Sequence, residues 1–524
     1  MRTLFALTTV LLMGTFSLSA QTSASLDINQ IEARVNVSGD LFWDLLGDPS
    51  FEAPKNSGKH TLFAGNLWIG TIDQSGQLRL AAQTYRQNGS DFLYGPVATT
   101  YDAAYDAAYN RLWKIEKADI DFHIANWENS GYIPAASIID WPANGNIFRG
   151  ESAQLAPFFD NDNDQLYDPA AGDHPLIRGD QAIFFMFNDI HLPHTETGGA
   201  PLGIEVHGMM YGYDNPSDSA QPHTVFMHYS IFNRSSVNLS EVYIGNWLDF
   251  DIGFYRDDYV GCDTLLETMY AYNGDNNDEG LNGYGLNAPA QGFTFLNHPM
   301  NSFMYYGNDF SGNENPTSPT DYYGLLTSRY INGMPVRDPN NNLTRHMYSG
   351  DPVAGTGWTE ANSALQASDR RGIGVVGPFT IGSGESFCVD GAYVYGRDSL
   401  NSDHLGSISV MRNRIKSIRH FYNYQNYTNC NLFSSTAVED ISHEIDINIY
   451  PNPASGFLFI ETKEALPGWK VELFDLTGRQ AIIQKIQNTS RVRLETGHLP
   501  GGIYILSVKN SDNQIIARQK VVLE

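Results

Sequence analysis

Apolar and polar residues alternate along much of this chain, and the alternation predicts β-strands. Residues 223–236 (HTVFMHYSIFNRSS) predict one strand, and residues 242–253 (VYIGNWLDFDIG) predict its partner. Residues 377–398 predict two strands joined by a Gly-Ser-Gly turn. Strand following strand with glycine-containing turns is typical of a β-sandwich, so we expect an all-β body that is rich in β-sandwich structure.

Helical spacing of apolar residues is confined to short segments. Ile408, Met411, Ile415 and Ile418 recur at intervals of three and four residues, which predicts a helix over residues 407–422. We expect a second helix over residues 103–113. The fold class is therefore all-β with few short helices.

The end of the chain, residues 447–524, has a strand pattern of its own. Val471 and Leu473 alternate with neighbours on the opposite face, and a Pro-Gly-Gly turn precedes another alternating run at 502–508. Pro451 and Pro453 cannot donate to a strand ladder, so we expect an extended edge or linker there. These features predict a small C-terminal β-sandwich.

The order of motifs in this tail resembles the type A C-terminal sorting domain of the type IX secretion system of Bacteroidetes. The matching residues are Tyr450, Pro451, Asn452, Pro453, Gly478, Gly501, Gly502, Tyr504 and Lys520. The resemblance implies that the tail is an export address, with the type IX translocon and its processing peptidase as partners. It also implies that the body is secreted or attached to the outer membrane through surface lipopolysaccharide.

The other end of the chain predicts export as well. Arg2 is followed by an apolar run from Leu4 to Phe16 and by small residues before Gln21, which is the pattern of a secretory signal peptide. We therefore divide the chain into a signal peptide (1–20), a body (21–430), a linker (431–446) and the sorting domain (447–524). The length of the body is compatible with one core or with two packed β units.

Five stretches of the body resemble a group of Bacteroidetes surface proteins. That resemblance implies secretion but no particular chemistry. The stretches are GDLFWDL (39–45), GKHTLFAGNLWIG (58–70), AAQTYRQNG (81–89), GDHPLIRGDQAIFFMFND (172–189) and DDYVGCD (257–263).

Composition narrows the possible partners. The chain has 59 acidic residues against 32 Lys and Arg, which argues against nucleic acid as a ligand. Cys262, Cys388 and Cys430 are the three cysteines, so at most one disulfide forms within the chain. Cys388 and Cys430 are a candidate pair, and Cys262 is interpreted as a buried structural thiol.

An acidic loop is the clearest candidate for metal chemistry. In FFDNDNDQLYDP (158–169), Asp160, Asp162, Asp164 and Asp168 stand at alternate or nearly alternate positions, and the Leu166 carbonyl is available between them. Calcium binds six to eight oxygen ligands, so the loop predicts a calcium site. Gln165 departs from the pattern of calcium loops, which have glycine at this position.

A second calcium candidate lies in residues 248–263 (LDFDIGFYRDDYVGCD). Asp249 and Asp251 share one strand face because side chains alternate with a period of two. Asp257, Asp258 and Asp263 follow and complete the candidate ligand set. The nearby acidic turn 272–280 is interpreted as a plain loop.

Histidines and tryptophans suggest further sites. His191, His194, Glu205, His207, His223 and His228 cluster in the sequence, but no HExxH motif occurs, and we interpret them as hydrogen-bonded structural residues rather than zinc ligands. Trp43, Trp68 and Trp127 would either fill the core or stack on sugar rings.

Three hypotheses for the body follow. The first is a calcium-stabilised, non-enzymatic module that binds a glycan or protein. The second is a secreted hydrolase acting on polysaccharide or peptide through a carboxylate pair. The third is a structural surface-layer component. A concave pocket that holds two carboxylates would favour the hydrolase.

Overall fold

The structure is a computed structural model. It describes residues 22–86, 88–307, 314–400, 403–425, 427, 447–466, 468–475, 480–487, 489–509 and 515–523. The chain forms two compact units, residues 1–433 and 434–524. The predicted signal peptide, the predicted linker, Cys430 and Gly478 lie outside the described residues.

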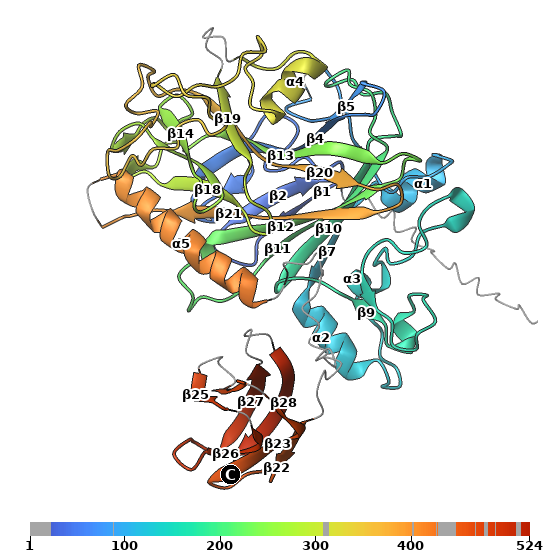
Figure 1. Cartoon of the computed structure of the whole chain (residues 1–524). Helices are drawn as coiled ribbons and strands as arrows, with labels where there is room; N and C mark the ends of the chain where they lie inside the picture. The colour runs from blue at the N-terminus through green and yellow to red at the C-terminus, as the bar shows by residue number, and fades with distance from the viewer. Residues whose placement is uncertain are drawn as a thin grey trace, which may run out of the picture. The chain divides into compact units, whose positions relative to one another are not determined.

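Two large antiparallel sheets make up the first unit, the body (Figure 1). The eight-stranded sheet comprises, in spatial order, β1 (Ser23–Leu26), β2 (Glu32–Asn36), β3 (Phe51–Glu52), β4 (His60–Ile72), β13 (Leu239–Phe250), β20 (Arg370–Ile381) and β19 (Ser302–Gly307), with β5 (Leu78–Ala81) paired to β4.

The nine-stranded sheet comprises β14 (Asp258–Asp263), β15 (Thr268–Asn273), β18 (Ala290–Phe295), β21 (Ser386–Gly396), β12 (Thr224–Asn233), β11 (Ile204–Gly212), β10 (Gln181–Asn188) and β6 (Leu93–Tyr94), with β7 (Trp113–Glu116) paired to β10. Two short ribbons complete the body, β8 (Phe158–Phe159) with β9 (His174–Pro175) and β16 (Asn277–Asp278) with β17 (Gly285–Leu286).

The inward faces of the two sheets share one hydrophobic core. Val225, Met227 and Ile231 of β12 belong to the same cluster of buried residues as Leu248 and Phe250 of β13. The alternation along residues 223–236 therefore corresponds to one core-facing side of β12, and the all-β sandwich prediction is confirmed. The body is one sandwich with a continuous core.

Short helices cover the outer faces of the sheets. They are α1 (Ala103–Tyr109), α2 (Lys117–Asn126), α3 (Ala136–Ile139), α4 (Pro319–Leu326) and α5 (Leu405–Tyr424), with 3-10 turns η1 (Ile147–Arg149), η2 (Pro169–Ala171) and η3 (Gln221–His223).

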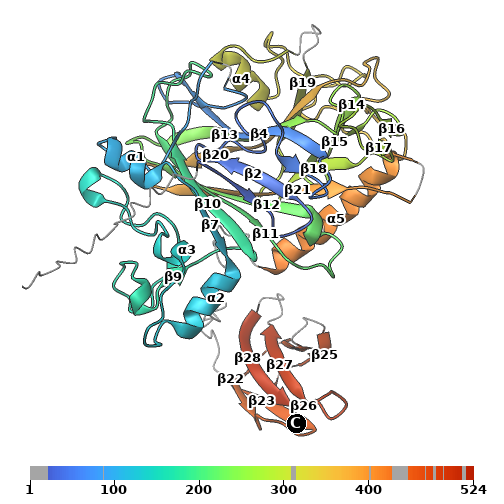
Figure 2. The same ribbon diagram turned by 180° about the vertical axis from the view of Figure 1, so that it is seen from behind.

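The longest helix, α5, lies along β18 and β21 of the nine-stranded sheet (Figures 1 and 2). Its predicted apolar residues, including Ile408 and Ile415, are fully buried. Gly396 permits the close approach, because a Cβ there would lie 2.5 Å from the backbone nitrogen of Met411. The predicted helix over residues 407–422 is confirmed.

Two local predictions are wrong in part. The helix predicted for residues 103–113 ends at Tyr109, and Trp113 begins β7. Strand β13 does not pair with β12, because it lies in the other sheet between β4 and β20. The two strands predicted around the Gly-Ser-Gly turn are confirmed as β20 and β21, and they belong to different sheets. Local periodicity indicates a strand but carries no information on its partner.

The second unit is a small sandwich of two sheets. One sheet has the order β22 (Ile447–Tyr450), β23 (Phe457–Leu466) and β26 (Thr489–Glu495), and the other has the order β25 (Gln480–Lys485), β24 (Lys470–Asp475), β27 (Gly502–Lys509) and β28 (Ile515–Leu523). Val471, Leu473 and Trp469 belong to its separate core. As predicted from the two prolines, the segment before Pro451 is an edge strand.

Candidate functional site

A pocket of about 420 Å³ opens on the outer face of the eight-stranded sheet, at the end of β13. Leu248 and Phe250 point into the core, so Asp249 between them points outward. The pocket is lined by Trp43, Gly47, Phe63, Tyr85, Asp249, Asp251, Tyr255, Asp369 and Arg371.

Local strand irregularity helps to shape this pocket. Asp249 faces Ala64 of β4, but the next residue, Phe250, faces Leu62, so Phe63 is an extra residue on β4. Such bulges redirect side chains and are frequent beside functional sites. Phe63 packs against Tyr85 with ring centroids 6.0 Å apart, and Trp43 lies 6.4 Å from Tyr85. These aromatic rings therefore form one packed group that lines the pocket together with the acidic residues.

Polar side chains at the base of the pocket are linked to one another. Arg371 stands directly opposite Asp249 across the β13–β20 ladder, and its Nε lies 3.1 Å from Asp249 Oδ1. The same Nε donates to the Tyr85 hydroxyl at 2.8 Å, and that hydroxyl donates to Asp249. Arg371 Nη1 lies 2.9 Å from Asp369 Oδ1. These contacts hold Asp249 and Asp369 in place.

Negative charge exceeds positive charge here. Asp249, Asp251 and Asp369 each offer a carboxylate oxygen, and the three oxygens lie within 4.8 Å of one another. Burial raises the pKa of Asp249 to about 7 despite the opposing effect of Arg371. Burial, followed by repulsion from Asp249 and Asp369, raises the pKa of Asp251 well above its ordinary value. Three carboxylates against one guanidinium favour either protonation or a bound cation.

The structure therefore separates the predicted ligands of the second calcium candidate, residues 248–263, into different groups. Asp249 and Asp251 come together as their shared strand face predicts, but the third partner is Asp369, which sequence reasoning missed. Asp263 lies apart, because its carboxylate accepts from the backbone of Leu265 and pairs with Arg412. Asp257 and Asp258 belong to a neighbouring acidic group.

The loop of residues 158–169 forms a different constellation from the predicted one. Asp160 and Asp162 come within 4.8 Å of Asp173, measured between carboxylate oxygens. Asp173, also missed, is fully buried and accepts from the backbone of Asn161 and Asp168 at 2.8 and 2.9 Å. Burial, followed by repulsion from its neighbours, raises the pKa of Asp162.

The remaining predicted ligands of this loop have local roles. Asp164 accepts from the backbone of Leu166 at 2.7 Å, and Asp168 caps the turn η2 by accepting from Ala170 at 2.8 Å. Gln165 adopts a φ of 68°, so the turn forms without the usual glycine. Calcium in this loop stays a prediction from the sequence.

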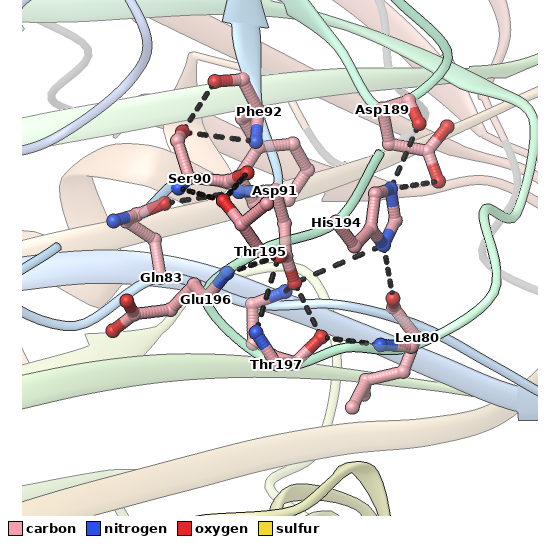
Figure 3. A network of polar contacts seen from close by, with 12 residues as sticks. Leu80, Gln83, Ser90, Asp91, Phe92, Asp189, His194, Thr195, Glu196 and Thr197 are labelled. Atoms are coloured by element: carbon pink, nitrogen blue, oxygen red, sulfur yellow. Dashed lines mark hydrogen bonds and ion pairs between the residues drawn. The ribbon is translucent and has the colours of Figure 1, made fainter. Parts of the chain in front are cut away.

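Three of the predicted histidines, His194, His207 and His228, are hydrogen-bonded as expected, whereas the buried Nδ1 atoms of His191 and His223 have no hydrogen-bond partner among the described residues. In Figure 3, His194 lies between Leu80 and Asp189, and its two ring nitrogens are 2.7 and 2.8 Å from their carbonyl oxygens. Asp91 and Asp189 lie 3.8 and 3.7 Å from the ring. His194 therefore joins two loops and has no nitrogen left for a metal.

His228 and His207 also have carboxylate partners. His228 Nδ1 lies 2.6 Å from Asp390, which is also paired with Arg178 at 2.7 Å, and His228 Nε2 lies 2.9 Å from the Ser230 hydroxyl. His207 pairs with Glu205 at 2.9 Å. These residues form a buried polar network on the outer face of the nine-stranded sheet rather than a zinc site.

The cysteines differ in state. Cys388 is disulfide-bonded, whereas Cys262 is free and fully buried. Burial raises the pKa of the Cys262 thiol, and its Sγ contacts the Met347 carbonyl at 3.3 Å. Cys262 is therefore a structural residue.

In the C-terminal unit, the motif residues connect its first and last strands. The Asn452 side chain donates to the Lys520 carbonyl and accepts from the Val522 backbone, both at 2.9 Å. The Tyr450 hydroxyl donates to Glu461 at 2.5 Å, and that of Tyr504 donates to the Pro500 carbonyl at 2.9 Å. The Pro-Asn-Pro motif thus ties β28 to the start of the unit.

A family profile described as "Secretion system C-terminal sorting domain" matches residues 448–524. The C-terminal unit is a type IX secretion sorting domain. A protein with this domain is secreted or attached to the cell surface and interacts with the type IX secretion machinery. Within the described residues, no helix has both the length and the apolar character needed to cross a membrane.

Other comparisons reveal only distant likeness. No curated protein matches the chain. A polysaccharide lyase structure matches with a TM-score of 0.19 at 6% identity, covering 61% of this chain and 34% of the lyase, so this chain spans about a third of that protein. PorZ, a surface component of the type IX secretion system of Porphyromonas gingivalis, matches with a TM-score of 0.14 at 10% identity, covering 96% of this chain and 75% of PorZ. Neither likeness establishes fold or activity.

Proposed function

We propose that the exported body binds carbohydrate in the pocket at the end of β13. The observation that carries the proposal is that three aromatic side chains, Trp43, Phe63 and Tyr85, line the same pocket as the clustered carboxylates and Arg371. Aromatic rings stack on the apolar faces of sugars, and carboxylates accept hydrogen bonds from sugar hydroxyls. The volume of the pocket, about 420 Å³, lies within the range of small-ligand sites.

A calcium ion is part of this proposal. The carboxylates of Asp249, Asp251 and Asp369 supply three hard oxygens within 4.8 Å of one another, and calcium prefers such ligands. Calcium takes six to eight ligands, so three carboxylates leave coordination positions for sugar hydroxyls. A divalent charge also balances the two negative charges that remain after Arg371 is counted.

A glycan array followed by calorimetry with and without calcium tests the proposal. Tyr255 also lines the pocket and is 37% exposed, so Tyr255→Ala removes one aromatic ring from the lining without opening the core. We expect a loss of affinity of about fivefold, because ring stacking contributes on the order of 1 kcal/mol. Tyr424→Ala, an exposed tyrosine at the end of α5, is the matched control. Equal losses in both variants, or no glycan bound, would reject the proposal.

The hydrolase remains a second candidate because of the same carboxylates. Asp249 and Asp251 lie in a pocket with carboxylate oxygens within 4.8 Å, which is close to the separation of about 5–5.5 Å found in retaining glycosidases. The raised pKa of Asp251 suits a general acid. Release of reducing ends from a bound polysaccharide, abolished by Asp251→Asn with binding retained, would identify the enzyme.

For export, we propose a more specific route than the domain match alone states. The type IX translocon reads the sorting domain, a processing peptidase removes it within residues 431–446, and the body is attached to surface lipopolysaccharide. The secretory signal peptide of residues 1–20 directs the first step. Mass spectrometry of the mature surface form tests each of these steps, and an intact C-terminus on the surface protein would contradict the processing step.

A further inference from the structure

A second acidic group lies beside the pocket, where β14 begins. Asp258, the first residue of β14, is fully buried. Its pKa is raised well above the ordinary value, first by burial and then by repulsion from Asp257, Asp251 and Asp278, and its Oδ2 accepts from the Ile252 backbone at 2.9 Å. Its other oxygen, Oδ1, has no hydrogen-bond partner among the described residues.

An independent observation on the neighbouring strand points to a ligand. Asn273 stands directly opposite Asp258 across the β14–β15 ladder and is fully buried. Residues in this relation project to the same face, with Cβ atoms about 4.5–5.5 Å apart. The Asn273 amide nitrogen donates to the Asp275 carbonyl at 3.0 Å, which identifies the other amide atom as the oxygen. Within the described part of the chain, that oxygen receives no hydrogen bond.

Asp257 adds a third oxygen of the same kind. Its Oδ1 is buried and receives no hydrogen bond among the described residues, whereas the carboxylate as a whole accepts from the backbone of Glu279. Burial, followed by repulsion from Asp278, raises the pKa of Asp257, and burial, followed by repulsion from both Asp257 and Asp278, raises the pKa of Asp258. Burial raises the pKa of Asp278, and the positive charges of Lys59 and Arg397 oppose this rise. Buried oxygens without a donor are costly, and a hard cation satisfies a group of such oxygens.

We propose that Asp258, Asn273 and Asp257 bind a calcium ion at a site distinct from the carbohydrate pocket. Mixed carboxylate and amide oxygens suit calcium, which tolerates irregular geometry, better than magnesium, which demands a near-ideal octahedron and keeps its waters. The ion joins the start of β14 to the end of β15 and to the turn that follows. The site does not rest on the proposed function of the pocket, because it uses none of the three pocket carboxylates.

The substitution Asp258→Asn gives this proposal a distinctive test. An asparagine keeps an oxygen for the Ile252 amide and supplies a donor toward the Asn273 oxygen, while it removes the buried charge. Without calcium, the variant should therefore melt at the same temperature as the wild type or higher. With calcium, it should show a smaller rise in melting temperature, because an ion bound only to the folded state stabilises it.

Calcium counted on the full-length protein by equilibrium dialysis and elemental analysis completes the test. We expect Asp258→Asn to lose one calcium ion per chain relative to the wild type. Asp369→Asn, which affects only the pocket, should retain this ion. Asn273→Leu, similar in size but without the amide oxygen, should also lose it, and this variant decides the matter if Asp258→Asn does not fold. Equal calcium content in the wild type, Asp258→Asn and Asn273→Leu would overturn the proposal, whatever happens in Asp369→Asn.

Discussion

The buried carboxyl of Asp249 should make the stability of the body depend on pH in an unusual direction. Its side chain is almost completely buried, and its pKa is about 7 in the folded protein against an ordinary value of 3.8. The perturbation is Asp249→Asn, which keeps the size of the side chain and removes the titration. The experiment is done with a chelator, so that no cation replaces the proton.

The sign follows from proton uptake. Below about pH 3.8 the carboxyl is protonated in both states and costs nothing. Between this value and pH 7 the unfolded chain loses the proton while the folded chain keeps it, so the free energy of unfolding falls as the pH rises. Above pH 7 the carboxyl is ionised in both the folded and the unfolded state, and the free energy of unfolding falls no further. A difference of about three pH units, at about 1.36 kcal/mol each, corresponds to a loss of up to about 4 kcal/mol.

Urea denaturation of the wild type and Asp249→Asn at a series of pH values from 4 to 8 measures this effect. Tryptophan fluorescence reports on the body, since every tryptophan except Trp469 precedes residue 431. Relative to the wild type, the variant should gain up to about 4 kcal/mol between pH 4 and pH 8. Glu241→Gln is the control, because Glu241 lies on the same strand but is exposed to water.

The reasoning fails if the difference in unfolding free energy between Asp249→Asn and the wild type is the same at pH 4 and pH 8. It also fails if Glu241→Gln shows a change of similar size. Saturating calcium should reduce the pH dependence of the wild type, because the ion replaces the proton as the partner of the carboxylate. This last result would link the stability of the fold to the proposed ligand site.

Three further predictions concern the core and the route of export. Arg178→Met should lower the unfolding free energy by about 3–5 kcal/mol by leaving the fully buried Asp390 without its arginine, as measured by urea denaturation. Ile415→Ala should cost about 2–5 kcal/mol because Ile415 is fully buried on the sheet-facing side of α5, whereas exposed Lys416→Ala should change stability by less than about 0.5 kcal/mol in the same assay. Deletion of residues 447–524 should keep the body in the periplasm, as seen by immunoblotting of cell fractions, and its normal appearance outside the cell would contradict the assignment of the sorting domain.

Local elements were readable from the sequence because their signals are local. The apolar residues of α5 recur with the period of a helix, and β12 alternates with the period of a strand, so both were predicted close to their observed bounds. The pairing of β13 was not readable, because its apolar pattern is satisfied equally well in either sheet. The C-terminal domain was recognisable because its motifs occur in a fixed order along the chain.

For the candidate sites too, the sequence predicted what depends on neighbouring residues and missed what depends on the fold. Asp249 and Asp251 were found together because a strand places every second side chain on one face. Asp369 and Asp173 were missed, since each reaches its partners only through the fold. The interpretation of residues 272–280 as a plain loop missed that Asn273 ends β15 and stands opposite Asp258 across the ladder.

The sequence by itself determined the class of fold, the route of export and the acidic segments in which cations are expected. These depend on composition, periodicity and motif order, which are properties of neighbouring residues. Only the tertiary structure decided which strands share a sheet, that aromatic side chains line one pocket with the carboxylates at the end of β13, and which buried oxygens lack donors. Such properties depend on how segments that are distant in the sequence pack together and exclude water. No local sequence pattern predicts that packing.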